Sequence, residues 1–515
     1  MAESLVVQPS GETTSSPPTA DGDRVPTFQK VAWGIGGITD NVMANGIQNL
    51  AVPIYQIALG VNPIWIGWAM AIPRFFDVLI DPFIGNISDN TRSPWGRRRP
   101  YIVAGAIISA IFFTAVWWAP MSLIGKSLTL SLPIWGTVKV EHLFIYFLFS
   151  SMLYYLGYAI FTITQGALGY EMSMDYNERT RIMAWKSFFA NASGVILPAI
   201  PKLSLWLPKW IEAHAGRWPD FLMRLVAHPS GVKIEAIGIR YVAMAAAVMI
   251  LVAGVIPGLF CKERVQAYKQ PKINVFRSIY MSLSNIPFMI LAVIIFTILV
   301  GLFVVNPLAL YINVYYVCNG NKDLAYEMVW YIGTIYAIMG VIVIPPISWI
   351  GTHYGKRQAM LFGQISVIVA QVASLWLFTP KHPYWQILQP MLCCPGLSCV
   401  WVLSGSMMAD ICDLDELKYG TRREGIFGAV FGMIFKAGVA TVGIVAGYIM
   451  VYSGINDKLP MQTPETLWRI RSLFAFVPVA FLSFSAFLTW IFPITEKSAR
   501  EVRAKIDARK KAAAL

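Results

Sequence analysis

Three charged residues lie inside an apolar stretch that is otherwise long enough to cross a membrane. Arg74, Asp77 and Asp81 interrupt the apolar run that begins near Ile64. Spacings of three, four and seven residues place all three on one face of a helix. A carboxylate near the bilayer centre costs at least about 2.5–3.5 kcal/mol, so two of them must line a protein interior or a water-filled cavity. We interpret this face as a functional site; the alternative is that Arg74 and one aspartate form a buried ion pair that braces the helices.

The spacing of the two carboxylates also indicates a chemistry. Two ionised carboxylates one helical turn apart repel each other, so one of the pair favours binding a proton or a metal cation. Asp40 and Asn41 lie in the middle of an earlier apolar run, and Asp40 is a further candidate site residue. The sequence carries no nucleotide-binding loop, metal-ligand cluster or nucleophile-base pair. We therefore expect a non-enzymatic protein without a cofactor.

The composition is that of a protein with many membrane spans. The chain has 515 residues, of which 56% are hydrophobic and 13% charged, and apolar runs repeatedly exceed the length of about 18 residues that a span requires. The formal net charge of +13 comes mostly from short loops and the C-terminus, where membrane topology and anionic lipid headgroups explain it. We expect membrane lipid but no nucleic acid as a partner. The six cysteines lack the paired spacing of zinc sites or disulfide frameworks.

The apolar runs predict an all-α protein with twelve spanning helices. The first six cover approximately residues 31–59, 64–88, 101–123, 142–172, 183–207 and 237–261, and the second six cover 286–316, 326–350, 359–379, 384–411, 426–453 and 467–494. We divide the chain into a disordered cytoplasmic tail (1–27), an N-terminal six-helix bundle (28–261), a cytoplasmic linker (262–285), a C-terminal six-helix bundle (286–495) and a basic cytoplasmic tail (496–515). An even number of spans predicts that both termini are cytoplasmic.

Two irregular features are expected within this pattern. The pair Asn306-Pro307 frees backbone groups near mid-membrane and permits a bend. The segment 207–236, rich in tryptophan and basic residues, has the pattern of an amphipathic helix lying on the outer membrane face.

A short motif occurs once in each half of the chain. Trp95-Gly96-Arg97-Arg98 follows the second predicted span, and Tyr354-Gly355-Lys356-Arg357 follows the eighth. This repeat predicts two halves related by an axis along the membrane normal, the arrangement described for major facilitator transporters. The basic residues of the loops either set the topology alone or also pin the two halves together on the inside.

Four ordered motifs resemble those of one transporter family. They are RFFDVLIDPFIG followed by TRSPWGRRRP (74–85 and 91–100), ALGYEMSMDYNERTR (167–181), MMADICDLDELKYGTRREG (407–425) and GMIFKAG (432–438). All are similar to motifs of the glycoside-pentoside-hexuronide:cation symporters of the major facilitator superfamily. The similarity runs from the first predicted span to the eleventh.

The resemblance implies roles for individual residues. Asp77 and Asp81 match the two aspartates of the family's cation site, Lys436 matches the lysine beside it, and Asp40 matches an aspartate that contacts sugar hydroxyls. Within its apolar run, Lys436 neutralises the carboxylates when the cation is absent and releases them when it binds.

The chain also departs from the family pattern. Thr162 occupies the position of a cation-binding aspartate, and Ala159 that of a neighbouring hydroxyl ligand. We assign Thr162 to the cation site, with Na⁺ possible at Asp77 and Asp81. Sodium prefers several oxygen ligands whereas a proton needs one carboxylate, so we favour protons. A stacking tryptophan and a sugar-contacting arginine of the family are replaced by Gly166 and Ser187, so the family's galactoside site is not reproduced.

We therefore expect a monomeric symporter of the inner (plasma) membrane that imports a sugar, glycoside or uronide with a cation by alternating access. Lysolipid cargo is an alternative, because lysolipid symporters resemble the same family, and a non-transporting membrane sensor is an alternative of another class. The substrate-binding candidates are Asp40, Asn41, Arg74, Gln165, Lys186 and Gln364.

Opposite charges also gather at the cytoplasmic ends of both predicted halves. We predict that they pair as a gate that closes the inner side when the cavity faces outward. The alternative is that they are solvated loop charges, each contributing less than about 1 kcal/mol. The gate candidates are Arg179, Arg181, Asp410, Asp413, Glu416, Arg422 and Arg423.

Overall fold

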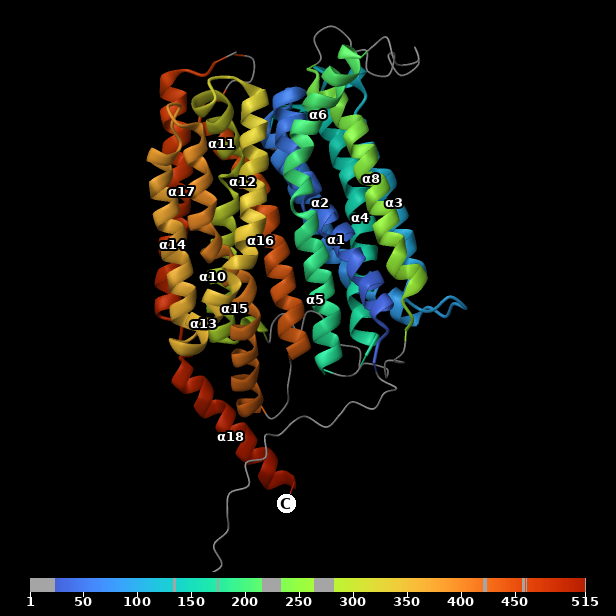
Figure 1. Cartoon of the computed structure of the whole chain (residues 1–515), viewed down its shortest axis with the longest axis vertical. Coiled ribbons are helices and arrows are strands. Elements are labelled where there is room, and N and C mark those ends of the chain that lie inside the picture. Colours follow the sequence, from blue (N-terminus) through green and yellow to red (C-terminus); the bar gives the residue numbers. More distant parts are fainter. Residues whose placement is uncertain are drawn as a thin grey trace, which may run out of the picture.

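Two helical bundles lie side by side in the computed structural model, and they follow each other in the sequence (Figure 1). The structure describes residues 24–132, 136–173, 176–214, 233–263, 282–419, 424–455, 459 and 461–514. The N-terminal half contains α1 (Thr27–Ala51), which continues as the π-helix η2 (Val52–Ala58), then α2 (Pro63–Asn90), α3 (Arg99–Trp117), η3 (Met121–Leu123), α4 (His142–Glu171), α5 (Tyr176–Ser193), α6 (Ile196–Ala213) and α8 (Glu235–Phe260).

The C-terminal half repeats this order. It contains α10 (Ile286–Phe303), α11 (Asn306–Tyr311), the π-helix η5 (Ile312–Val317), α12 (Lys322–Ile342), α13 (Ile344–His353), α14 (Lys356–Leu377), η6 (Pro383–Ile387), α15 (Leu388–Tyr419), α16 (Glu424–Tyr452), α17 (Pro464–Trp490) and α18 (Glu496–Ala514). Among the described residues, eleven helical segments are long and apolar enough to cross a membrane. The remaining predicted span, the first in the chain, is α1 with η2, whose polar residues include Asp40, Asn41 and Asn45. The predicted fold class of two six-helix halves is confirmed.

Three spans predicted as continuous helices are broken. The fifth divides into α5 and α6 at Gly194 and Val195, and the seventh divides directly before Asn306, where the sequence predicted a bend. The eighth divides at Val343, just before Pro345 and Pro346. Proline is tolerated in the first turn of a helix but removes a hydrogen bond inside one, so the chain restarts its helices there.

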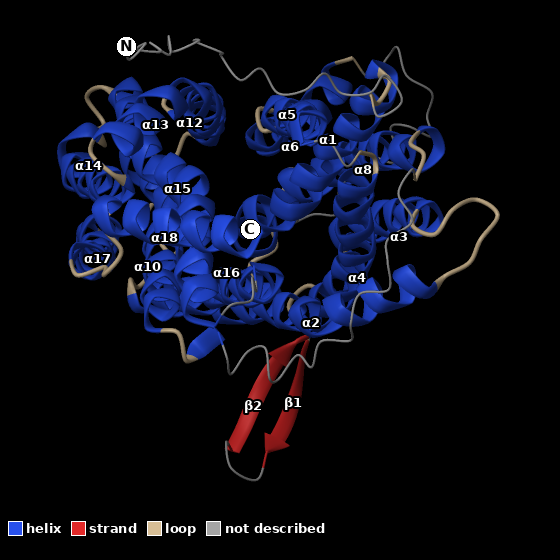
Figure 2. Cartoon of the chain, turned by 90° about the horizontal axis from the view of Figure 1, so that it is seen from below, coloured by secondary structure: helices blue, strands red, loops and turns tan. Residues whose placement is uncertain are grey.

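A β-hairpin joins α3 to α4, where the sequence pattern predicted only a connecting segment. Strands β1 (Ser127–Leu132) and β2 (Gly136–Glu141) pair antiparallel, with Ser127 opposite Glu141. Figure 2 shows the hairpin projecting away from the helices. Most of the N-terminal tail (1–27), the linker (262–285) and the predicted amphipathic segment (207–236) lie outside the described residues.

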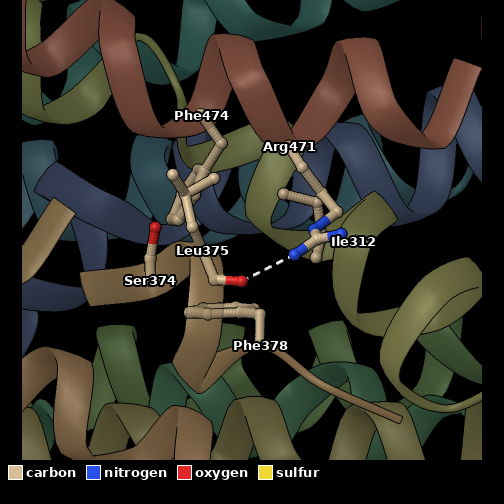
Figure 3. Close-up of a pocket in the computed structure, with 6 residues that line it drawn as sticks. All are labelled: Ile312, Ser374, Leu375, Phe378, Arg471 and Phe474. Carbon is tan, nitrogen blue, oxygen red and sulfur yellow. Dashed lines mark hydrogen bonds between the residues drawn. The ribbon is translucent and has the colours of Figure 1, made fainter. Parts of the chain in front are cut away.

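An arginine in the last span of each half fixes the end of that half's third span. Arg240 of α8 donates to the Ala119 carbonyl at 2.6 Å, just beyond α3. Arg471 of α17 donates to the Leu375 carbonyl of α14 at 2.6 Å (Figure 3). Its guanidinium also lies over the Tyr316 ring. Because carbonyls at a helix C-terminus lack partners within the helix, both arginines satisfy such groups. The internal repeat therefore extends beyond the loop motif.

Candidate cation and substrate site

The two aspartates of α2 and the lysine of α16 meet between the two halves. The Lys436 ammonium lies 3.0 Å from Oδ2 of Asp77 and also forms an ion pair with Asp81. Helices α2 and α16 pack against each other, although they belong to different halves. One cation therefore joins two carboxylates across the interface between the bundles.

Asp77 occupies an unusual environment for an ionised group. Its side chain is fully buried, and neither of its oxygens accepts a hydrogen bond from the described part of the chain. Asp81 is 30% exposed and leaves Oδ1 without a hydrogen bond there. A buried charge is costly unless it is paired and hydrogen-bonded. The pair therefore depends on a cation, supplied in this structure by Lys436.

Glycines allow α2 and α16 to approach closely enough for this contact. A Cβ atom on Gly67 would lie 2.3 Å from the carbonyl oxygen of Gly443, and one on Gly447 would lie 2.6 Å from that of Pro63. Small residues let membrane helices pack backbone to backbone. Lys436 lies seven residues, or two turns, before Gly443, so the glycine contact sets its position opposite α2. These glycines were not singled out from the sequence.

Arg74 takes a different role from either of its predicted ones. Its guanidinium donates to the Ala44 carbonyl of α1 at 2.6 Å and lies over the rings of Tyr155 and Tyr158 at 4.3 and 5.7 Å. Within the described chain it forms no ion pair with an aspartate, and it is 7% exposed. Arg74 therefore ties α2 to α1 and α4 rather than pairing with an aspartate, and its contact with substrate stays a prediction.

A second charged cluster lies within the N-terminal half. Lys186 of α5 forms an ion pair with Asp40 of α1 at 2.9 Å, and both side chains are a little over one fifth exposed. The Thr162 hydroxyl of α4 donates to the other Asp40 oxygen at 2.8 Å. Trp33 lies near the lysine, its ring centroid 5.7 Å from the ammonium. Thr162 thus contacts Asp40 in this structure, and its assignment to the cation site stays a prediction.

Two polar residues predicted to contact substrate instead join helices. The Asn41 amide donates to the Ala190 carbonyl and the Ser193 hydroxyl of α5, both at 3.0 Å. The fully buried Gln165 of α4 donates to the Trp33 carbonyl of α1 at 3.2 Å. Interhelical hydrogen bonds of this kind hold membrane helices together. In this structure both amides therefore join helices, and their contact with substrate stays a prediction.

Gln364 is likewise inside a helix interface. This residue of α14 is 2% exposed, and its amide donates to the hydroxyls of Ser485 and Thr489 on α17, at 3.1 and 2.9 Å. It therefore braces the C-terminal bundle in this structure, and its contact with substrate stays a prediction.

The loop between α2 and α3 (residues 91–98), which we call the arginine loop, is anchored within its own half. Arg97 and Arg98 form ion pairs with Glu171 at the end of α4, at 2.6 and 2.8 Å. Glu263, just beyond α8, accepts hydrogen bonds from the backbone N–H groups of both arginines. These contacts lie within one half, and the alternative that the arginines also pin the two halves together stays a prediction.

The second copy of the loop motif forms a similar contact. Lys356 pairs with Asp410 of α15 at 2.7 Å, again within one half. Because α15 and α4 occupy equivalent places in their halves, each bundle anchors its loop to the end of its fourth span. Asp410, a predicted gate residue, therefore pairs inside its own half in this structure.

Another ion-pair cluster lies at the end of the molecule that carries the arginine loop. Glu178 pairs with Lys30 at 2.6 Å and with Arg181 at 2.9 Å, all within the N-terminal half. Burial raises the pKa of the Glu178 carboxyl, but the hydrogen bonds and charges of Lys30 and Arg181 outweigh it and lower the pKa overall. Asp413 and Glu416 lie on the last turns of α15. The Arg179 side chain and residues 422 and 423 lie outside the described part of the chain.

Comparison with known proteins identifies the class of the chain. The model of the family described as MFS/sugar transport protein matches residues 32–496. An uncharacterized symporter of Synechocystis sp. is 25% identical, with 93% of this chain and 96% of that protein aligned. The glucuronide carrier protein homolog of Escherichia coli is 22% identical, covering 93% and 95%, and the isoprimeverose transporter of Lactiplantibacillus pentosus is 24% identical, covering 90% and 88%.

Solved structures agree on the fold. The nucleoside transporter NupG superposes with a TM-score of 0.59 at 12% identity, covering 90% of this chain and 98% of its own. Family and structural neighbours are membrane transporters rather than enzymes. The chain therefore belongs to the MFS/sugar transport protein family, and its motifs and relatives are those of the glycoside-pentoside-hexuronide:cation symporters within the major facilitator superfamily.

Proposed function

We propose that the chain is a secondary active symporter that imports a sugar, glycoside or uronide together with a cation. The observation that carries this proposal is the ion pair of Lys436 with Asp77 and Asp81, which crosses from one half to the other. In alternating access the two halves move against each other around a central site. A charge contact between them links the occupancy of the site to that movement.

The coupling ion acts by replacing Lys436 on the aspartates. When a cation binds at Asp77, one carboxylate charge is neutralised and the attraction that joins α2 to α16 weakens. A buried carboxylate without a positive partner is strongly unfavourable, so Asp77 is paired either with Lys436 or with the coupling ion. The ion and the lysine therefore compete for the same carboxylate. Ion binding therefore shifts the equilibrium between the two conformations of the halves, because it changes their relative energies.

The ligand count favours a proton as the coupling ion. The described residues contain no group of three or more His, Cys, Asp or Glu side chains placed to hold a metal ion. Thr162 is bonded to Asp40 rather than to Asp77 or Asp81. Two carboxylates alone are a small ligand set for sodium, whereas one carboxylate suffices for a proton.

Asp40 and Lys186 form the substrate-binding centre of this proposal. Both side chains are partly exposed, and together they offer an acceptor and a donor for sugar hydroxyls. Relatives named as a glucuronide carrier homolog and an isoprimeverose transporter support a sugar or glycoside as cargo.

No observation favours a lipid cargo over a sugar. The apolar groove of the N-terminal half runs between α3 and α8 and is lined by aliphatic residues such as Ile107, Val252 and Val255. In Figure 1 these two helices lie on the side of the N-terminal half that faces away from the C-terminal half. The groove is therefore separate from the charged site between the halves.

The orientation follows from the distribution of basic residues. We place the end that carries the arginine loop, and with it both termini, in the cytoplasm, and we place the protein as a monomer in the inner (plasma) membrane.

We also retain the cytoplasmic gate: as the outer side opens, Asp413 and Glu416 at the end of α15 approach Arg181 at the start of α5.

Ligand-dependent stabilisation of the purified protein tests the function. A bound ligand raises the unfolding temperature by mass action. We expect a rise with one class of sugars, glycosides or uronides, which the Asp40→Asn variant loses. The same ligand should accumulate in proteoliposomes only when an ion gradient is present. A ligand that binds but is never concentrated inside the vesicles would contradict the symporter assignment and favour a sensor.

A further inference from the structure

Among the described residues, three ion pairs connect the halves at the end opposite the arginine loop. All of them involve the first two turns of α12 in the C-terminal half, and their partners belong to α6 and α8 of the N-terminal half. The pairs are Lys322–Glu235 at 2.5 Å, Lys209–Asp323 at 2.8 Å and Lys202–Glu327 at 3.5 Å.

We propose that these six residues form an outer lock, which holds the outer side of the transporter closed and must break before the cavity can open outward. The proposal rests on the alternating access of the proposed function, but it can be tested by conformation alone. In Figure 1 the ends of α6 and α12 that carry the lock lie side by side, at the opposite end of the molecule from α13 and α18.

The burial of each ion pair indicates which of them contributes most to holding the outer side closed. The Glu235 side chain is 3% exposed and that of Lys322 is 28% exposed, whereas Lys209 and Asp323 are 47% and 66% exposed. Exposed ion pairs contribute little, because water screens them. Removing one partner of a buried pair leaves an uncompensated charge. Glu235 and Lys322 should therefore hold the closed state, and Lys209 with Asp323 should add little.

Helices α6 and α12 also pack closely against each other beneath the ion pairs. Gly333 of α12 faces Pro198 of α6 so closely that a Cβ atom on the glycine would lie 2.3 Å from the proline ring. Between this contact and the surface, Lys202 lies over the Trp330 ring, 5.4 Å from its centroid. The proline ring is rigid and cannot turn away. A methyl group at position 333 would therefore push α6 and α12 apart.

A shared apolar cluster lies at the same end. Val52 and Ile57 of η2 pack with residues of the C-terminal half that include Leu308, Tyr311 and Met450. The outer closure thus combines charged and apolar contacts between the halves. Loss of the Glu235–Lys322 pair removes only part of it, so the variant protein should still fold and insert.

The test measures the distance between the outer ends of the halves. Spin labels on Ala213→Cys and Lys381→Cys report it, because both positions are exposed in one half each and all six native cysteines are buried. We expect Lys322→Gln and Gly333→Ala each to raise the population with a long outer distance by at least about tenfold. The control Gly340→Ala lies on the same helix in open space and should change nothing.

A charge exchange separates the lock from a general loss of stability. The double variant Glu235→Lys with Lys322→Glu should restore the short distance that either single variant loses. If Lys322→Gln keeps the parental distance distribution, the lock is refuted, whatever Gly333→Ala does. A shifted distribution in a protein that transports nothing would uphold the lock while refuting the proposed symport.

Discussion

Lys436 of α16 reaches across the interface between the halves to Asp77 of α2, with 3.0 Å between its ammonium nitrogen and Oδ2 of the aspartate. Asp77 is buried and receives no hydrogen bond from the described residues, so its charge is balanced by this lysine. Helices α2 and α16, which are far apart in the sequence, are therefore joined by one cluster of ion pairs. Any cation that binds Asp77 alters the contact between the halves.

The first prediction concerns the aspartates. Asp77→Asn and Asp81→Asn should each abolish concentrative uptake, because the asparagine amide cannot take up the coupling ion. Exchange of labelled substrate across vesicles without a gradient should persist, since the Asp40 cluster is intact. Uptake in proteoliposomes with and without an ion gradient measures both activities. Asn86→Ala, an exposed position on the same helix, serves as the control. Gradient-driven uptake at the parental rate in either aspartate variant would remove these residues from the cation site.

The second prediction concerns the lysine. Lys436→Ala should lower the free energy of unfolding by about 3–5 kcal/mol, the usual cost of leaving a buried charge unpaired, and should impair coupling. Adding Asp77→Asn to this variant should restore most of the lost stability, because the unpaired charge is then gone. Thermal unfolding of the four proteins forms a double-mutant cycle. Additive effects of the two substitutions would show that the residues do not interact.

The third prediction distinguishes the two charged clusters. Thr162→Val removes the hydroxyl that donates to Asp40 but keeps the side-chain shape. Loss of a hydrogen bond to a charged group costs about 1.5–3 kcal/mol, so we expect KM for substrate to rise about tenfold or more. The dependence of uptake on the ion gradient should stay unchanged. An altered ion dependence with an unchanged KM would return Thr162 to the cation site.

The charged residues of the spans were readable from the sequence, but their partners were not. Asp77, Asp81 and Lys436 stand out because a charge inside an apolar run is too costly to occur without a partner. An amide in such a run is less informative, because it either faces a cavity or bonds a neighbouring helix. Gln364 has the second role, and only the positions of Ser485 and Thr489 on another span reveal it.

Close contacts between spans were equally inaccessible to sequence patterns. Gly67 and Gly443 resemble many other glycines in the chain, and only the crossing of α2 and α16 shows that their backbones touch. The sequence showed that the loop motif is repeated, but the motif alone does not indicate which acidic group its basic residues contact. Arg98 contacts Glu171 in its own half.

The fourth prediction addresses the cytoplasmic gate. In this structure Arg181 pairs with Glu178 inside the N-terminal half. If Arg181 approaches Asp413 when the inner side closes, Asp413→Arg should slow uptake severalfold through like-charge repulsion, and adding Arg181→Glu should recover it. Initial uptake rates of the single and double variants provide the measurement. An unchanged rate in Asp413→Arg, with no further change in the double variant, would reject the gate.

The last prediction is the identity of the driving ion, where the family resemblance and the geometry differ. The family uses a third aspartate for sodium, but its position holds Thr162, which is bonded to Asp40. The remaining pair of carboxylates, counted with Lys436, carries a net charge near −1 and offers few oxygen ligands. Fewer oxygens weaken sodium binding more than protonation, because a metal ion needs several ligands and a proton needs one. Uptake should therefore rise with an inward proton gradient, stop when a protonophore is added in sodium-free medium, and change less than about twofold when sodium is supplied. If uptake instead requires sodium at fixed pH and membrane potential, backbone carbonyls or water must complete a metal site at Asp77 and Asp81, and the proton assignment fails.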